Sequence, residues 1–179
     1  MQTEIEHVRA TAELLHSQAA IDAALDTMAT QINQLLAGRD PLILCVMNGG
    51  LVTAGHLLTR LTIPLTIDAI NASRYQNKTV GEDIEWLTKP RVSLKDRTIL
   101  IIDDILDAGI TLAAIYDYCL QEGASSIYTA VLLSKDLPYK KPITADFVGL
   151  TVPDRYVFGY GMDYKGYWRN ANGIYACVE

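Results

Sequence analysis

The 179-residue chain contains little cysteine and little histidine, with three residues of each type. Cys45, Cys119 and Cys177 are odd in number, lie far apart and form no Cys-x-x-Cys pair, so we expect neither a disulfide framework nor a zinc site. The histidines match no catalytic pattern in the residues around them. These scarcities argue against the disulfide-rich and zinc-bound classes and favour a protein of the reducing cytoplasm.

The chain also lacks a long apolar run and an excess of positive charge. No stretch reaches the ~18 consecutive apolar residues of a membrane-spanning helix, and the first residues show no basic-plus-apolar signal pattern. The 21 acidic residues outnumber the 15 basic ones, for a formal net charge of −6. We therefore expect no membrane and no nucleic-acid partner, and an anionic ligand would need local donors.

What the chain does have is apolar content and a strong alternation of patterns. Half of its residues are hydrophobic, enough for a sizeable core in one domain spanning residues 1–179. β-Branched apolar runs alternate with amphipathic stretches, which is typical of a parallel sheet covered by helices on both faces. The expected strands are 42–47, 64–70, 84–88, 98–103, 127–133 and 146–150, and the expected helices are 17–36, 50–61 and 111–122.

Two stretches fall outside this alternation. Residues 71–83 are polar, lack a clear period and are long for a connection, so we expect a functional loop there. Residues 151–179 carry aromatics, glycines and charges, and we expect a small irregular appendage outside the core, which occupies about residues 38–150.

Residues 98–111 carry the most chemistry. An apolar run ends in Asp103 and Asp104, Asp107 and Gly109 follow, and a helix is expected to open at Thr111. Carboxylates can hold hydroxyls or a metal, while backbone N–H groups at a helix start can hold a phosphate. A sugar phosphate needs that combination, although receiver domains and other nucleotide binders also place acids at a strand end.

This stretch resembles the phosphoribosyl-pyrophosphate signature of the type I phosphoribosyltransferases. The resemblance implies a Rossmann-like α/β fold, with a central parallel sheet flanked by helices and a small hood formed by residues 151–179 and part of the N-terminus. It implies that Asp103 and Asp104 hold the ribose hydroxyls. At the position of Ala108 the family often has Thr. The residues implied to hold the 5′-phosphate are Asp107, Ala108, Gly109, Ile110 and Thr111.

Two further segments match that family. Residues 47–50 form a glycine-rich turn between an expected strand and helix, and by resemblance Asn48 and Gly49 contact pyrophosphate. A tight turn without a ligand explains the glycines equally well, and many purine members have Lys or Arg at Asn48. The sequence Ser73-Arg74-Tyr75 lies where the family has a flexible loop that closes over the reacting centre.

Residues 152–164 resemble the hypoxanthine-guanine branch of the family. There the aromatic Tyr156 would stack on the purine, and Val157 would read it through backbone groups. Lys135 would donate to the purine O6, since an ammonium has donors and no acceptor. Asp163 would hold Mg²⁺ through water, with Asp103 and Asp104 as further metal-site residues, and Arg169 would contact pyrophosphate. The alternative without a ligand is that these charged side chains are simply solvated and that Tyr156 is a packing residue.

The resemblance implies purine salvage: the chain would transfer phosphoribosyl from phosphoribosyl pyrophosphate to hypoxanthine or guanine. Asp107 would be the catalytic residue, acting on the purine N7 proton. Mg²⁺ would be the cofactor, and a homodimer or homotetramer is expected. Alternatives are a regulator on the same fold that senses nucleotides, or a transferase that prefers xanthine or adenine.

Overall fold

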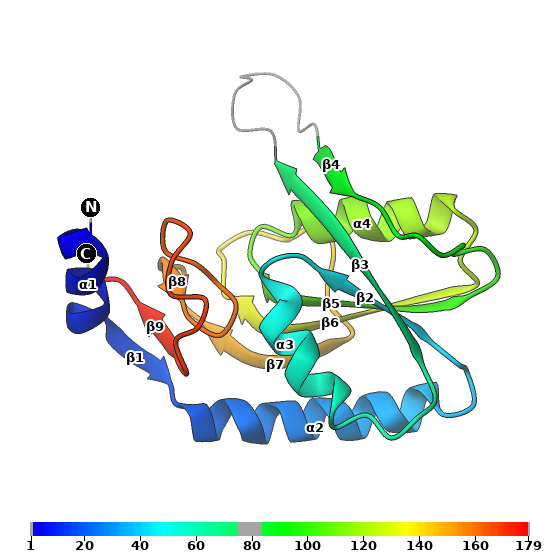
Figure 1. Ribbon diagram of the computed structural model, residues 1–179, viewed down its shortest axis with the longest axis horizontal. Helices are drawn as coiled ribbons and strands as arrows, with labels where there is room; N and C mark the ends of the chain where they lie inside the picture. Colours follow the sequence, from blue (N-terminus) through cyan, green and yellow to red (C-terminus); the bar gives the residue numbers. More distant parts are fainter. Residues whose placement is uncertain (1, 75–83, 179) are drawn as a thin grey trace.

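Six strands form the central sheet in the computed structural model, which describes residues 2–74 and 84–178 (Figure 1). All neighbouring pairs in this sheet are parallel except β3 and β4, which are antiparallel. The predicted α/β class with a parallel core is therefore confirmed. In spatial order the strands are β4 (Ile84–Thr88), β3 (Thr66–Arg74), β2 (Leu42–Val46), β5 (Thr98–Leu106), β6 (Ser126–Lys135) and β7 (Phe147–Val152).

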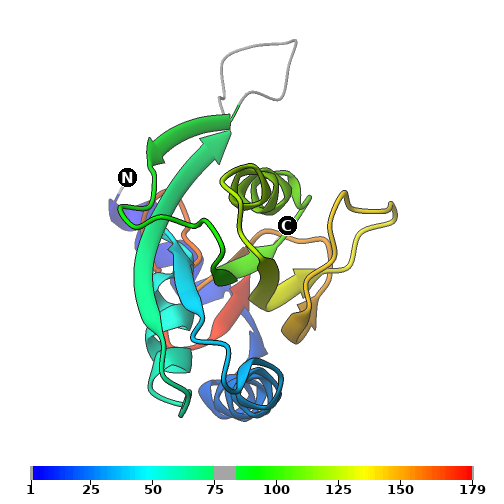
Figure 2. The same ribbon diagram turned by 90° about the vertical axis from the view of Figure 1, so that its right-hand side faces the viewer.

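Helices cover both faces of this sheet (Figure 2). Helices α2 (Gln18–Leu36) and α3 (Gly50–Leu58) lie on one face, and α4 (Ile110–Gln121) lies on the other. Because side chains alternate along a strand, Leu100 and Ile102 of β5 pack towards α2 and α3, whereas Ile99 and Ile101 pack towards α4. All four are essentially unexposed, as expected for a strand in the centre of a covered sheet.

Helix α2 shows how local sequence sets an element's bounds. The Ser17 hydroxyl caps it by accepting a 3.3 Å hydrogen bond from the backbone N–H of Ala20, a common N-terminal device. The apolar residues of this helix recur at helical spacing and predict one buried stripe made of Ile21, Leu25, Met28, Ile32 and Leu35. All of these are buried except the last. There Leu36 is fully buried and Leu35 is 42% exposed, so the last stripe position is one residue later than predicted.

Strand ends differ most from the prediction. Strand β3 continues to Arg74, where it pairs with Ile84 of β4, so residues 71–74 are strand and not loop. Strand β5 continues through the acidic pair to Leu106, which pairs with Ser134 of β6. In both cases a neighbouring strand supplies hydrogen-bond partners that the local pattern does not reveal.

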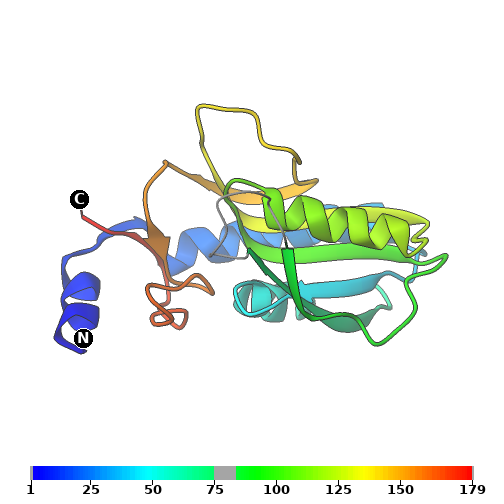
Figure 3. The same ribbon diagram turned by 90° about the horizontal axis from the view of Figure 1, so that it is seen from above.

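Residues from both ends of the chain form a second, three-stranded antiparallel sheet in the order β1 (Glu13–His16), β9 (Ile174–Ala176) and β8 (Val157–Phe158). We call this sheet and the loops of residues 153–178 the hood; it lies at one end of the molecule beside both termini (Figure 3). Val157, Tyr160 and Ile174 belong to the same buried cluster as α2 and α3. The expectation of an irregular appendage outside the core was therefore wrong.

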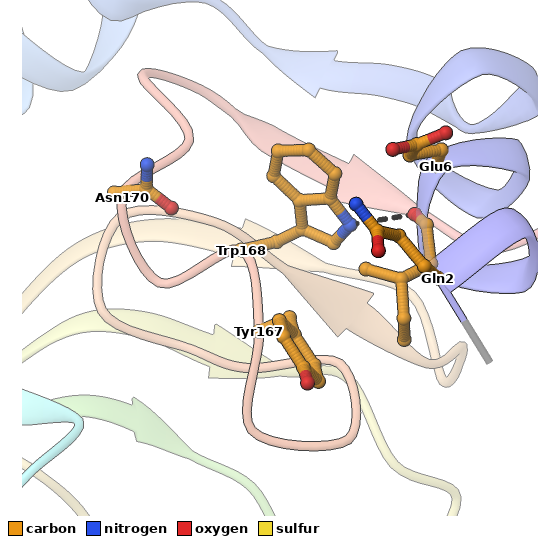
Figure 4. Close-up of a pocket in the computed structure, with 6 residues that line it drawn as sticks. Gln2, Glu6, Tyr167, Trp168 and Asn170 are labelled. Atoms are coloured by element: carbon orange, nitrogen blue, oxygen red, sulfur yellow. Dashed lines mark hydrogen bonds between the residues drawn. The ribbon is translucent and has the colours of Figure 1, made fainter.

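Helix α1 (Gln2–Thr11) packs on the hood through Trp168, whose indole N–H donates a 2.7 Å hydrogen bond to the Ile5 carbonyl (Figure 4). A hollow of about 440 Å³ lies beside this contact, and no predicted site residue lines it. The lining residues of the hollow are Gln2, Ile5, Glu6, Tyr167, Trp168 and Asn170.

In the described part of the chain, no helix is both long and apolar enough to cross a membrane.

Candidate active site

The order of the strands places a crevice between the carboxyl ends of β2 and β5. From β2 the chain moves outward to β3, and it later returns to the other side of β2 to form β5. The helices that follow these two strands, α3 and α4, lie on opposite faces, so their connecting loops diverge. Ligands of open α/β sheets bind at such a switch point. A cavity of about 240 Å³ occurs there, lined by residues 46–49 and 103–109 together with Thr111, Leu112, Ala72 and Arg169.

Asp103 and Asp104 form the floor of this cavity. They are only 9% and 8% exposed, and the Asp103 carboxylate accepts a 2.8 Å hydrogen bond from the backbone N–H of Asp104. Burial, together with the neighbouring charge of Asp104, raises the pKa of Asp103 well above its usual value. Burial also raises the pKa of Asp104, although the positive charge of Arg169 opposes this rise. Hydroxyl donors or a cation would therefore be favoured here.

Two helix N-termini open onto the same cavity. Helix α4 begins after Gly109, whose φ of 84° lies in the left-handed region that glycine tolerates best, and α3 begins after Gly49. No side chain of the described residues caps either start. In α3 the Leu51 N–H already donates a 3.2 Å hydrogen bond to the Asn48 carbonyl, whereas the start of α4 lines the cavity with Gly109, Thr111 and Leu112. Uncapped backbone N–H groups at such a helix start can bind an anion, with the helix dipole adding to the attraction.

The turn at Gly49 is packed tightly between the acidic pair and the hood. A Cβ on Gly49 would overlap the Asp104 carboxylate, and a Cβ on Gly161 of the hood would overlap the Gly49 carbonyl oxygen. Asn48, beside it, is exposed and lines the cavity. The backbone of this turn therefore contacts the hood on one side and approaches the carboxylates on the other.

A second cavity of about 250 Å³ adjoins the first and shares Asp104, Ile105 and Asp107 with it. The Lys135 ammonium lies 3.2 Å from the Asp107 carboxylate and 3.8 Å from that of Asp154. A carboxylate and an ammonium thus form an ion pair where the two cavities join. The remaining lining residues of the second cavity are Lys135, Tyr156, Val157, Met162 and Asp163.

The Tyr156 ring is held at one edge and open elsewhere. Tyr164 packs against it edge to face, with 5.7 Å between ring centroids, and the Tyr156 hydroxyl donates a 3.1 Å hydrogen bond to the Asp163 carbonyl. The side chain remains 54% exposed in spite of these contacts. Such an exposed aromatic at a cavity wall offers a surface on which a planar ring can stack.

Asp163 and Arg169 link the two cavities through a 2.7 Å ion pair. Arg169 also donates a 2.7 Å hydrogen bond to the Gly161 carbonyl, which fixes it on the hood above the acidic pair.

The described residues contain no group of three or more side chains arranged to hold a metal. Mg²⁺ typically binds through one or two carboxylates together with substrate phosphates and water, so the adjacent buried carboxylates of Asp103 and Asp104 suit it.

The structure thus gathers most of the predicted residues into one two-part site. Ser73 lies in β3 opposite Glu85 and lines neither cavity, while the Arg74 side chain and Tyr75 fall outside what the structure describes. Sequence reasoning missed Met162 and Asp154 as neighbours of Lys135's cavity. Both lie within two residues of named motif positions, and adjacency was the only available signal.

A model of the phosphoribosyl transferase domain matches residues 11–165 of the chain. The chain belongs to the phosphoribosyl transferase family. A member of this family from Bacillus subtilis, a hypoxanthine-guanine phosphoribosyltransferase, is 33% identical over 159 residues, which cover 88% of each chain. The human protein of the same name is 30% identical over 163 residues, covering 86% of this chain and 74% of the human one.

Other matches extend the comparison in length and in structure. The bifunctional protein TilS/HprT of Listeria innocua is 31% identical over 159 residues, and this phosphoribosyl transferase spans only 24% of its length. A solved hypoxanthine phosphoribosyltransferase from Staphylococcus aureus is 27% identical, with a TM-score of 0.87 over 93% of this chain and 91% of that one. Most of the chain thus follows the fold of a solved phosphoribosyltransferase.

Proposed function

We propose that the chain is a hypoxanthine-guanine phosphoribosyltransferase of purine salvage. It transfers the 5-phosphoribosyl group from phosphoribosyl pyrophosphate to hypoxanthine or guanine, giving the nucleoside monophosphate and pyrophosphate. The observation that carries this proposal is the pair of adjoining cavities that meet at Asp107. One offers carboxylates and helix N-termini, which suit a sugar phosphate, and the other offers an ammonium and an aromatic ring, which suit an oxopurine. The named relatives support the same reaction.

In this proposal the first cavity binds phosphoribosyl pyrophosphate. Asp103 and Asp104 accept hydrogen bonds from the ribose 2′- and 3′-hydroxyls, and the turn from Asp107 to Thr111 binds the 5′-phosphate through backbone N–H groups. Pyrophosphate lies against Asn48, Gly49 and Arg169, whose guanidinium suits a phosphate group. The tight packing at Gly49 supports a backbone role for this turn.

The second cavity binds the purine. Lys135 donates to O6, Tyr156 stacks on the ring, and Val157 contacts the ring edge through its backbone. The ammonium favours an oxo group over the amino group of adenine because it can donate and cannot accept. The half-open Tyr156 ring and the low exposure of the Lys135 side chain, 11%, support these roles.

Asp107 is the catalytic residue in this proposal. The purine N9 forms a bond to C1′ while the bond from C1′ to the pyrophosphate oxygen breaks, through an oxocarbenium-like transition state. Asp107 takes the N7 proton as N9 attacks. Its position at the junction of the cavities, 3.2 Å from the Lys135 ammonium, supports this role.

Mg²⁺ is the proposed cofactor. Asp103 and Asp104 would hold it with the ribose hydroxyls and pyrophosphate, and Asp163 would reach it through water. When bound, it neutralises the charge of the leaving pyrophosphate. By family resemblance we also propose a homodimer or homotetramer that acts in the cytoplasm.

A purine panel tests the proposal. The pure protein, Mg²⁺ and phosphoribosyl pyrophosphate are mixed in turn with hypoxanthine, guanine, xanthine or adenine, and monophosphate formation is followed by absorbance. We expect turnover of hypoxanthine and guanine and none of adenine. A preference for xanthine would overturn the base assignment alone. Binding of phosphoribosyl pyrophosphate without turnover of any base would overturn the enzyme and favour a nucleotide-sensing regulator.

A further inference from the structure

Lys141 holds together the two loops that carry the proposed catalytic and purine-binding residues. It lies in the connection between β6 and β7, outside every segment that matched a motif. Its ammonium donates to three oxygen atoms: the Lys135 carbonyl at 2.6 Å, the Leu106 carbonyl at 2.7 Å and the Ser134 hydroxyl at 3.1 Å. An ammonium has three donors, so this set of acceptors satisfies it completely.

The three acceptors lie at functionally critical points of the backbone. Leu106 directly precedes Asp107 at the end of β5, and Lys135 ends β6. One ammonium therefore anchors the backbone of the lysine that faces the purine and the backbone next to the acid that takes its proton. Charge-assisted hydrogen bonds of this length are among the stronger ones in proteins. Burial lowers the pKa of Lys141, but the nearby Asp107 and Asp136 oppose this and favour the charged form.

The residues that follow Lys141 reinforce the same anchor. A Cβ built on Gly109 of the phosphate turn would lie 3.4 Å from both Pro142 and Ile143, in near contact with each. The segment 141–143 thus forms the outer wall of the turn, with the ammonium at one end and two apolar side chains behind Gly109.

We propose that Lys141 is a positioning residue that sets the distance between Asp107 and Lys135, and with it the alignment of the purine. The inference rests on the proposed function and assigns Lys141 no contact with substrate. Loss of the ammonium would free two carbonyls in adjacent loops, and small displacements of reacting groups have large effects on rate.

Lys141→Met, which removes the ammonium and keeps an unbranched side chain one atom shorter, is the test. We expect kcat/KM for hypoxanthine to fall roughly 10–100-fold, with the loss in kcat and in the hypoxanthine KM and little change in the KM for phosphoribosyl pyrophosphate. Lys140→Met is the matched control, because Lys140 is the exposed neighbour with the same charge, and its kinetics should equal those of the wild type. Equal kinetics for the two variants would overturn the proposal.

A double-mutant cycle with Lys135→Met separates positioning from general damage to the fold. If Lys141 acts through Lys135, the fold loss of kcat/KM caused by Lys141→Met should be smaller by about 5-fold or more in the Lys135→Met background than in the wild type. Losses that simply multiply would contradict the proposal.

Ser134→Ala is the second test, should Lys141→Met fail to fold, because it removes one acceptor and leaves the ammonium. We expect a fall of about 2–5-fold in kcat/KM for the purine, and no fall would overturn the proposal. The wild type is assayed alongside: without its turnover both proposals fail, whereas normal turnover with unaffected variants removes only this one.

Discussion

At Gly49 the backbone lies so close to the acidic pair that any side chain must displace a buried carboxylate. We expect Gly49→Ala to lower kcat/KM for phosphoribosyl pyrophosphate about 100-fold or more, because a shift of Asp104 misplaces both the ribose hydroxyls and the loop donors. Steady-state kinetics with varied phosphoribosyl pyrophosphate would measure this loss.

Gly55 provides the matched control within the same helix. A Cβ there meets nothing within 4 Å, so Gly55→Ala should leave the kinetics unchanged. It should also stabilise α3 by about 0.5–1 kcal/mol, since alanine loses less conformational freedom in a helix than glycine does. Equal activity of the two alanine variants would show that the contact at Gly49 is unimportant.

Asp107 should matter for chemistry more than for binding. We expect Asp107→Asn to lower kcat about 10²–10⁴-fold, because an amide cannot take the N7 proton. The KM for phosphoribosyl pyrophosphate should change far less, since the 5′-phosphate is held largely by backbone donors. Asp117→Asn, which alters an exposed carboxylate of α4 that lines neither cavity, should behave like the wild type. Undiminished turnover in Asp107→Asn would remove the proposed base.

At the scale of elements, Asp68 fastens β3 to the segment that leads into β5. One carboxylate oxygen accepts hydrogen bonds from the backbone N–H groups of Arg91, at 2.6 Å, and Val92, at 3.2 Å, and the other accepts one from Ala69. Partial burial works against the charge, but these backbone donors outweigh it and lower the pKa of Asp68. We expect Asp68→Asn to destabilise the fold by about 1–2 kcal/mol at pH 7.

The pH dependence of this loss follows from the direction of the pKa shift. Because the pKa of Asp68 is lower in the folded state, its stabilisation is complete above the unfolded value, about 3.9, and disappears as the pH falls through the folded value. Urea unfolding from pH 7 to below pH 4 should show the difference between Asp68→Asn and wild type shrinking at the acid end. A constant difference would contradict this, and the exposed Asp117 supplies the control substitution Asp117→Asn.

The strands of the central sheet show which features could be predicted from the sequence. The apolar run of β5 and the acids after it are local in the chain, so the strand, the helix start and the acidic pair were all predictable. The extension of β5 to Leu106 depends on pairing with β6, and that of β3 on pairing with β4. Lys141 was missed because its three acceptors come from two separate strand ends, and nothing in its local sequence indicates them.

At the scale of the whole molecule, the hood depends on contacts between distant parts of the chain. Strand β8 has two residues and pairs with β9, which pairs in turn with β1 near the other end of the chain. Strands this short carry too little pattern to recognise in a sequence. The buried cluster that joins hood residues to α2 and α3 leads us to expect that hood and core unfold as one cooperative unit.

The chain's two tryptophans can test this cooperativity, because they report on separate regions. Trp86 lies in β4 and packs on Tyr118 of α4, with 5.0 Å between ring centroids, whereas Trp168 lies in the hood and contacts α1. Trp86→Phe leaves a hood reporter, and Trp168→Phe leaves a sheet reporter. Ile174→Ala, which empties a fully buried position in β9, is then introduced into each, with the exposed Val178→Ala as its control.

We expect Ile174→Ala to destabilise the fold by about 2–5 kcal/mol and to lower the urea midpoint equally for both reporters. The reason is that Ile174 packs in the cluster shared with α2 and α3, so a cavity there weakens the structure that both tryptophans depend on. Val178→Ala should move neither midpoint. A fall seen only by Trp168 would instead show that the hood unfolds separately, as a second domain on the parallel sheet.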